Sequence, residues 1–266
     1  MEKEVLNLPE FLQTCLIVCP LVFLAGFVDS VAGGGGLISL PAYLFVGFPA
    51  HLASGTNKVV ASTGTALATW KYYKSGKIRM KPALLAAVGA LIGSVLGTQI
   101  ALHINSEAFR ILLLIALPLV ALLITFKKDF GNDQATDAPV CETNKDRIIC
   151  FLIGIGIGCY DGLIGPGTGT FLIMAFTIFV NMDLLTASGC AKVGNLASNI
   201  ASAVLWITSG NVMFELIIPA AACSMLGNYL GSQYAIKGGS QKVRGMIYIV
   251  LAMLFIKFFY ELFLAA

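Results

Sequence analysis

Apolar segments follow one another along almost the whole chain, and all but 37–49 and 169–181 are long enough to cross a lipid bilayer as straight helices. A helix rises about 1.5 Å per residue, so about 20 apolar residues cross a hydrocarbon layer about 30 Å thick. Only 12% of the residues are charged, about half the share of a typical soluble domain. The pattern predicts an all-helical polytopic membrane protein with segments at 11–33, 37–49, 52–70, 83–102, 108–126, 148–164, 169–181, 186–207, 215–236 and 245–264.

The composition also excludes several classes of protein. The net charge is only +3, and no basic run is interleaved with aromatic residues, which argues against nucleic-acid binding. The first residues, MEKEVLNLPEF, lack the basic start and cleavage site of a removable signal peptide. The seven cysteines are odd in number and without metal-ligand spacing, so we expect small buried side chains and no disulfide framework. No motif indicates a cofactor or a metal site.

Residues of the first half of the chain recur in the second half at a nearly constant spacing. The matches fall into two groups, and the spacing between matching residues is two residues longer in the second group than in the first. Gly26, Asp29, Gly33 and Gly35 recur as Gly158, Asp161, Gly165 and Gly167, and Ser54, Gly55, Lys58, Gly93, Gly97 and Arg110 recur as Ser188, Gly189, Lys192, Gly227, Gly231 and Arg244. We therefore expect an internal duplication, with repeats at 1–126 and 148–266 joined by a polar linker at 127–147.

An odd number of segments per repeat would insert the second copy in the opposite orientation. Loops on the cytoplasmic side carry an excess of lysine and arginine. Such residues occur in loops 71–82, 127–147 and 237–244 and are absent from loops 103–107 and 208–214. Five segments per inverted repeat, with both termini outside, place all three basic loops in the cytoplasm.

The two shortest segments each follow a glycine-rich break, at 33–36 and at 165–169. Unwound backbone at membrane depth is tolerated where it lines a cavity or is buried in protein, and the free N–H groups at a helix start attract anions. Paired broken helices in inverted repeats are typical of a transporter site. We expect the substrate to contact Gly33, Gly34, Gly35, Gly36, Gly165, Gly167, Thr168 and Gly169. The alternative is that these glycines only let helices pack closely, which is the role we expect for Gly93/Gly97 and Gly227/Gly231.

Four charged residues lie well inside the apolar segments, and their charges sum to zero. They are Asp29, Lys58, Asp161 and Lys192. Charges at this depth pair with one another or line a pathway, so two readings remain open. Either two Asp–Lys ion pairs hold the halves together, or the lysines hold an anion while an aspartate takes up a proton. The uncharged candidates for substrate binding are Ser54, Thr56, Asn57, Asn195 and Asn199. Trp70, Tyr72, Tyr73 and Trp206 fall at segment ends, where we expect interfacial anchors.

The motifs GFVDSVAGGGGLISLP, HLASGTNK, GCYDGLIGPGTGTF and AKVGNLASNIAS resemble those of the TauE/SafE (sulfite exporter) permease family over essentially the whole chain. The resemblance is greatest to a bacterial inner-membrane branch. It implies secondary transport of sulfite, sulfoacetate or a related organosulfur anion across the inner membrane. Many members carry Gly-Thr-Ser where this chain reads GTNK. The added Lys58 and Lys192 indicate either a more strongly anionic substrate or an ion pair particular to this branch.

The sequence thus predicts an inverted-repeat secondary transporter for a small anion, coupled to protons in its transport cycle, and not an enzyme. A passive anion channel is the main alternative. An intramembrane aspartyl protease is a weaker one, because Tyr160-Asp161 matches one half of its dyad but the GxGD half is absent. The glycine run also lacks the GK[ST] of a nucleotide-binding loop. The expected partners are the bilayer and the anion, and lipid-facing GxxxG surfaces would allow a homodimer.

Overall fold

The computed structural model describes residues 8–113 and 143–264, and within these ranges the chain is helical with no strand. Most of the helices are long, and each of the two short ones directly follows a glycine-rich break. The helices are α1 (Leu8–Ala32), α2 (Gly36–Phe45), α3 (Ala50–Lys74), α4 (Met80–His103), α6 (Asn144–Leu163), α7 (Thr168–Phe179), α8 (Leu184–Thr208) and α9 (Phe214–Leu264).

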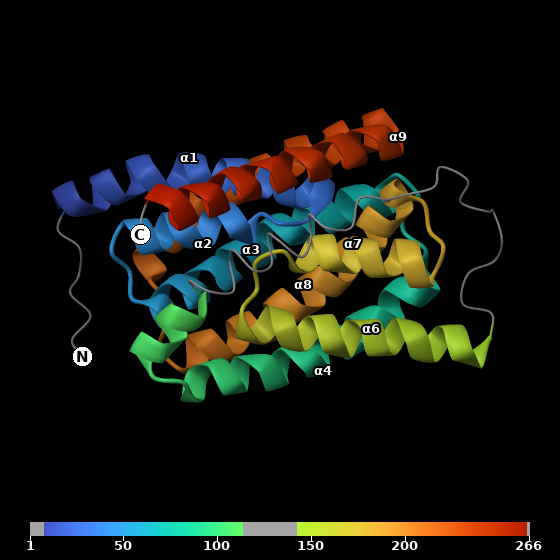
Figure 1. The fold of residues 1–266 in the computed structure, drawn as a ribbon, viewed down its shortest axis with the longest axis horizontal. Helices are drawn as coiled ribbons and strands as arrows, with labels where there is room; N and C mark the ends of the chain where they lie inside the picture. The colour runs from blue at the N-terminus through green and yellow to red at the C-terminus, as the bar shows by residue number, and fades with distance from the viewer. Residues whose placement is uncertain (1–7, 114–142, 265–266) are drawn as a thin grey trace.

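Two pairs of long helices form opposite edges of the molecule, as Figure 1 shows. Helices α1 and α9 pack along one edge, and α4 and α6 pack along the other. Between them α3 contacts both α8 and α9, and α8 also contacts α4. The short helices α2 and α7 lie in this central layer, next to α3 and α8 respectively. The two glycine breaks are therefore held in the middle of the fold.

Small residues make the two edge pairs possible. A Cβ atom added to Gly93 or Gly97 on α4 would overlap the backbone of α6, and one added to Gly227 or Gly231 on α9 would overlap the backbone of α1. The packing role predicted for these glycines is confirmed. Because α6 and α1 cover these faces within one chain, our expectation that they face lipid and could form a dimer contact is wrong. The homodimer itself stays a prediction.

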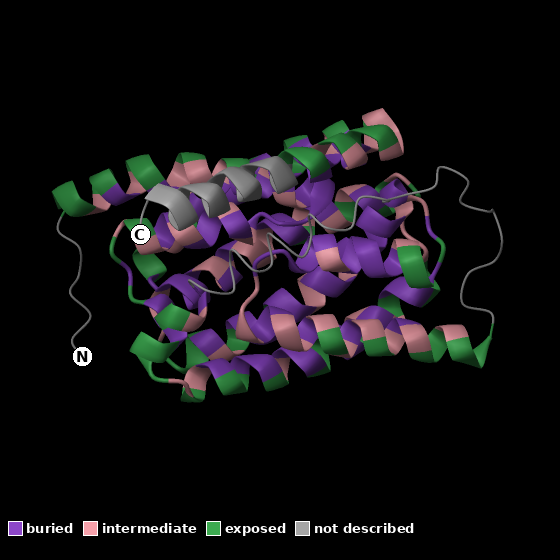
Figure 2. Cartoon of the chain, in the orientation of Figure 1, coloured by how far each residue is buried: buried purple, intermediate pink, exposed green. Residues whose placement is uncertain are grey.

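The outer surface is rich in large apolar side chains. Leu16 on α1 is 75% exposed and Ile218 on α9 is 80% exposed, and Figure 2 shows exposed residues along the edge helices around a buried centre. Such a surface suits a lipid environment. By length and composition, α1 and α4 are each able to span a membrane.

Every predicted segment that lies fully within the described residues coincides with a helix. Segment 108–126 is described only as far as residue 113, and that part is helical. Helix α6 begins at Asn144, before the predicted start at 148, because Thr143 and Asp146 form a capping box: the Thr143 hydroxyl accepts from the Asp146 N–H at 3.1 Å, and the Asp146 carboxylate accepts from the Thr143 N–H at 3.3 Å. The inverted repeat stays a prediction.

The chain reverses within the predicted loop at 237–244 (Figure 1), but the turn is much shorter than predicted. Helix α9 runs through this region, and only Gly239 leaves the helical conformation, with φ 67° and ψ −166°. The residue is a kink that turns the chain back, so that the second part of α9 returns to the end of the molecule where α1 begins (Figure 1).

Two of the aromatic residues expected as interfacial anchors are core residues instead. Tyr72 is fully buried, and its hydroxyl lies 2.9 Å from the Ser30 carbonyl oxygen and 3.2 Å from the Ser188 hydroxyl. Trp206 is 1% exposed and packs against His51. Trp70 and Tyr73 are more than half exposed, as an anchor requires. An aromatic residue at a helix end can therefore face a neighbouring helix as well as lipid.

Asp183 fixes the junction between α7 and α8. Its carboxylate accepts from the N–H of Thr186 at 3.0 Å, which caps α8, and from the hydroxyl of Ser240 at 3.3 Å beside the α9 kink. Burial alone would raise the pKa of Asp183, but these hydrogen bonds outweigh it and hold the pKa below its ordinary value. The side chain thus ties the start of α8 to the kink of α9.

Candidate functional site

The first glycine break places the carboxylate of Asp29 over the start of α2. Gly33 and Gly34 have φ values of 72° and 121°, a left-handed region that glycine adopts without strain. This turn lets the N–H groups of Gly34 and Gly35 point back at Asp29 Oδ1, at 3.3 and 3.4 Å. An acidic side chain at this end of a helix also opposes the helix dipole. The start of α2 is therefore already occupied by an anion, namely Asp29.

The second glycine break leaves the start of α7 differently arranged. Gly165 and Gly167 have φ values of 92° and 86°, and no side chain caps the helix at Gly167. Asp161, the counterpart of Asp29, lies 2.7 Å from the hydroxyl of Thr168. Its carboxylate thus bonds a side chain of the first turn and leaves the backbone amides of α7 without a carboxylate cap.

The two breaks touch each other. A Cβ atom at Gly33 would overlap the backbone of Gly169, and a Cβ at Gly169 would lie 2.7 Å from the Cα of Gly33. The hydroxyl of Thr170 accompanies this contact, 3.0 Å from the Ala32 carbonyl oxygen and 2.7 Å from that of Gly33. Gly33 and Gly169 therefore let the two breaks pack closely, and Gly33 also allows the left-handed turn before α2.

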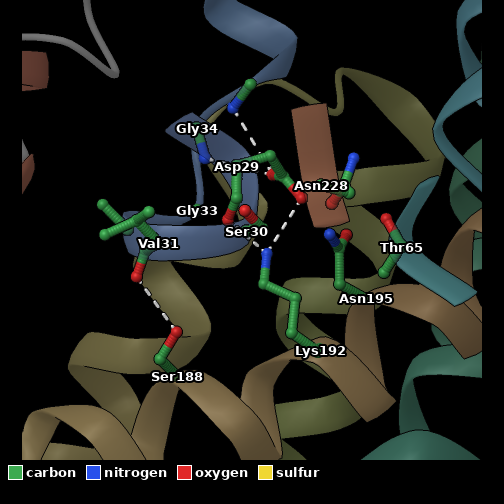
Figure 3. A network of polar contacts seen from close by, with 12 residues as sticks. Asp29, Ser30, Val31, Gly33, Gly34, Thr65, Ser188, Lys192, Asn195 and Asn228 are labelled. Atoms are coloured by element: carbon green, nitrogen blue, oxygen red, sulfur yellow. Dashed lines mark hydrogen bonds and ion pairs between the residues drawn. The ribbon is translucent and has the colours of Figure 1, made fainter. Parts of the chain in front are cut away.

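Two buried ion pairs connect the halves of the chain. Lys58 Nζ on α3 lies 2.6 Å from Asp161 Oδ2 on α6, and Lys192 Nζ on α8 lies 2.9 Å from Asp29 Oδ2 on α1. Lys58 also donates to Asn199 Oδ1 at 3.1 Å, and Lys192 also donates to the Asp29 carbonyl oxygen. Figure 3 shows the second pair. Both Asp–Lys ion pairs form in this conformation, and each crosses from one half to the other. The role of these charges in transport stays a prediction.

A cavity of about 60 Å³ lies between these elements, large enough for a few water molecules or a small ligand. Most of the residues that the sequence singled out line it. They are Asp29, Gly34, Gly35, Gly36, Ser54, Asn57, Lys58, Asp161, Gly165, Gly167, Thr168, Gly169, Asn195 and Asn199.

Three predicted substrate contacts do not line the cavity. Gly33 packs against Gly169. Thr56 is fully buried, and its hydroxyl oxygen accepts from the N–H of Met213 at 3.0 Å. Lys192 is fully buried, with its ammonium group engaged by Asp29. Among the residues that the structure describes, only Lys58 brings positive side-chain charge to the cavity wall.

Sequence reasoning missed four polar residues of the lining: Ser39, Thr65, Ser224 and Asn228. Each is a single polar residue within an apolar helix, where a hydroxyl commonly bonds its own backbone. A signal was present in the helical period, because Thr65 lies seven residues after Lys58 on α3, and Ser224 and Asn228 are four residues apart on α9. Residues at these spacings share a helix face.

The arrangement of the charged groups does not fit the aspartyl-protease alternative. Each aspartate is paired with a different lysine, whereas an aspartyl protease needs two carboxylates that share a proton. Within residues 8–113 and 143–264, no three potential metal-ligating side chains come together. Besides the paired carboxylates of Asp29 and Asp161, the cavity wall carries the Lys58 ammonium group, the start of α7 without a side-chain cap, and neutral amide and hydroxyl groups, which together can hold a small anion.

Comparison with known proteins finds relatives over nearly the whole chain. Residues 18–258 match the family described as "Sulfite exporter TauE/SafE". A "Probable membrane transporter protein" of Haemophilus influenzae is 31% identical over 243 residues, covering 90% of this chain and 92% of the relative. The "Probable membrane transporter protein YfcA" of Escherichia coli K12 is 29% identical over 258 residues, covering 94% and 93%. No solved structure matches significantly. The chain belongs to the TauE/SafE family and is a probable membrane transporter.

Proposed function

We propose that the protein is a secondary transporter that moves a small organosulfur anion or sulfite across the bacterial inner membrane, coupled to protons. The observation that carries the proposal is the cavity, which is walled by both glycine breaks and by the buried Lys58–Asp161 pair. The family description names sulfite export, and sulfoacetate and related sulfonates share its anionic oxygen chemistry.

The start of α7 is the candidate anion-binding element. Gly167, Thr168 and Gly169 line the cavity there, and no side chain caps the helix. A helix start carries about half a positive charge, and its unpaired N–H groups bind oxyanions. The start of α2 is less suitable because the Asp29 carboxylate already accepts from its amides. We therefore place the anion nearer to α7 and Lys58.

Charge balance supports proton coupling. The four buried charges sum to zero, so a bare anion would leave the cavity with an uncompensated charge, which is costly at low dielectric constant. A proton on Asp161 would release Lys58 to face the anion and would restore neutrality. Asp29 is less suited to this role, because it accepts from Lys192 and from two backbone amides, whereas Asp161 accepts from Lys58 and Thr168.

Alternating access would move the halves of the chain relative to each other around this cavity. Both ion pairs cross between the halves, so both would be strained or exchanged during such a movement. The basic residues of loop 71–82 and of the α9 kink lie toward the same end of the molecule in Figure 1, which we propose is the cytoplasmic end. Both termini would then face outward.

Flux into proteoliposomes tests the proposal. Uptake of sulfite and of sulfoacetate is measured with and without an imposed pH gradient, for wild type, Lys58→Met and the exposed-lysine control Lys74→Met. We expect saturable uptake that follows the gradient, a loss in Lys58→Met and no change in Lys74→Met. Non-saturating flux that ignores the gradient would indicate a channel. No flux of either anion would refute the substrate assignment.

A further inference from the structure

Asn228 on α9 presents a buried hydrogen-bond acceptor that nothing in the described part of the chain satisfies. The residue is 2% exposed and lines the cavity. Its Nδ2 donates to the Ser224 carbonyl oxygen at 3.0 Å, whereas its Oδ1 has no partner. Rotating the amide would lose the Ser224 bond, because a carbonyl oxygen cannot bond an amide oxygen. Burying an acceptor without a donor costs free energy, so we expect a ligand in the cavity to supply the donor.

The amide occupies a recess that fits it closely. A Cβ atom at Gly26 would lie 2.8 Å from the Asn228 Nδ2, and one at Gly64 would overlap the same group. Helices α1 and α3 therefore each leave out a side chain where Asn228 packs. Figure 3 shows the Asn228 amide facing the same space as Thr65 and Asn195, and all three line the cavity. The recess fixes the amide beside the proposed substrate position.

A second cavity residue, Ser54 on α3, also has a buried oxygen without a partner. Its hydroxyl can donate to an anion, as can the α7 amides and Lys58. Donors for an anion are thus numerous, and Asn228 Oδ1 is the group that an anion without hydrogens would leave unsatisfied. The lining is therefore complementary to a ligand that both accepts and donates.

We propose that Asn228 is a specificity-determining residue that accepts a hydrogen bond from the transported anion. Among the anions of the proposed function, the site accordingly selects one that carries its own O–H or N–H group, such as singly protonated sulfite, over a fully deprotonated oxyanion or an alkyl sulfonate such as sulfoacetate. This inference rests on the proposed function, and it names the substrate class of the same site.

Two monoanions of nearly equal shape test the proposal. Sulfamate carries an NH₂ group where methanesulfonate carries a methyl group. Each is used to inhibit sulfite uptake in proteoliposomes and to raise the thermal unfolding temperature of the detergent-solubilised protein. We expect sulfamate to bind about 5- to 100-fold more tightly, the range that follows from leaving a buried acceptor unpaired.

Variants at the same site provide the second arm. Asn228→Leu should bind the two anions within about twofold of each other, and Asn228→Ser should retain part of the preference. Gln233→Leu removes an amide from the same helix outside the cavity lining and should keep the full preference.

Equal binding of the two anions by the wild type, or binding of neither, would overturn the proposal, as would an unchanged preference in Asn228→Leu. If sulfite flux is absent, the proposed transport function fails, but the unfolding-temperature comparison still decides the role of Asn228. If flux is present and the preference is absent, only the inference about Asn228 fails.

Discussion

Removing the charge of Lys58 should destabilise the protein far more than removing the charge of a surface lysine. Lys58 and Asp161 are 5% and 2% exposed, and their charged atoms lie 2.6 Å apart. At an effective dielectric constant of about 20, the attraction at this distance is roughly 6 kcal/mol, but desolvation of the two ions offsets much of it. Lys58→Met would keep the cost of burying Asp161 and remove the compensation.

The expected loss for Lys58→Met is about 3–5 kcal/mol, the range observed when one member of a buried pair is removed. Asn199 would lose a donor as well. The double variant Lys58→Met/Asp161→Asn buries neither charge. Its free energy of unfolding should therefore be at least about 2 kcal/mol higher than the value expected if the two single effects were additive.

The assay is reversible unfolding in mixed micelles for wild type, both single variants and the double variant. Lys74→Met is the matched control, because Lys74 is exposed at the end of α3, and it should change stability by no more than about 0.5 kcal/mol. The reasoning would be refuted if Lys58→Met were as mild as Lys74→Met, or if the effects of the two single variants were simply additive.

Three further substitutions test other parts of the account. Gly33→Ala should cost at least about 2 kcal/mol more than Gly76→Ala, because both positions have φ near 70° but only Gly33 is crowded; equal unfolding midpoints would contradict the contact between the breaks. Gly97→Leu should abolish the folded monomer in size-exclusion chromatography, whereas Gly156→Leu, in open space on α6, should not. Asp183→Ala should cost about 1 kcal/mol at pH 7. Since the folded pKa of Asp183 is lowered, this difference should be lost as pH falls below about 4; a difference that grew on acidification would be inconsistent.

Much of the fold follows from local features of the sequence. The length of each apolar run predicts a helix, and the glycine-rich stretches predict the breaks before α2 and α7, because both signals depend on nearby residues only. Failures occur where distant contacts decide the outcome. Tyr72 is buried because Ser30 and Ser188 offer it hydrogen-bond partners, and these residues are far away in the sequence.

The candidate site was likewise predictable only in part: its charged residues were, but their pairing was not. Charge at membrane depth identified all four ion-pair residues, since each must have a partner there. Which lysine pairs with which aspartate depends on how α3 meets α6 and how α8 meets α1, and it was not predictable. Asn228 was missed because a single amide in an apolar helix is a weak signal. Its spacing from Ser224 places both residues on one helix face, but only the neighbouring Gly26 and Gly64 show that this face has room for the amide.

The central claim is that anion and proton share one cavity, with Asp161 as the proton carrier. The most direct measurement compares two activities of Asp161→Asn in proteoliposomes: exchange of labelled sulfite at equal concentrations, and accumulation driven by a pH gradient. The account predicts that exchange persists while gradient-driven accumulation is lost, because the variant remains permanently neutral at this position. Accumulation at the wild-type level in Asp161→Asn would contradict it.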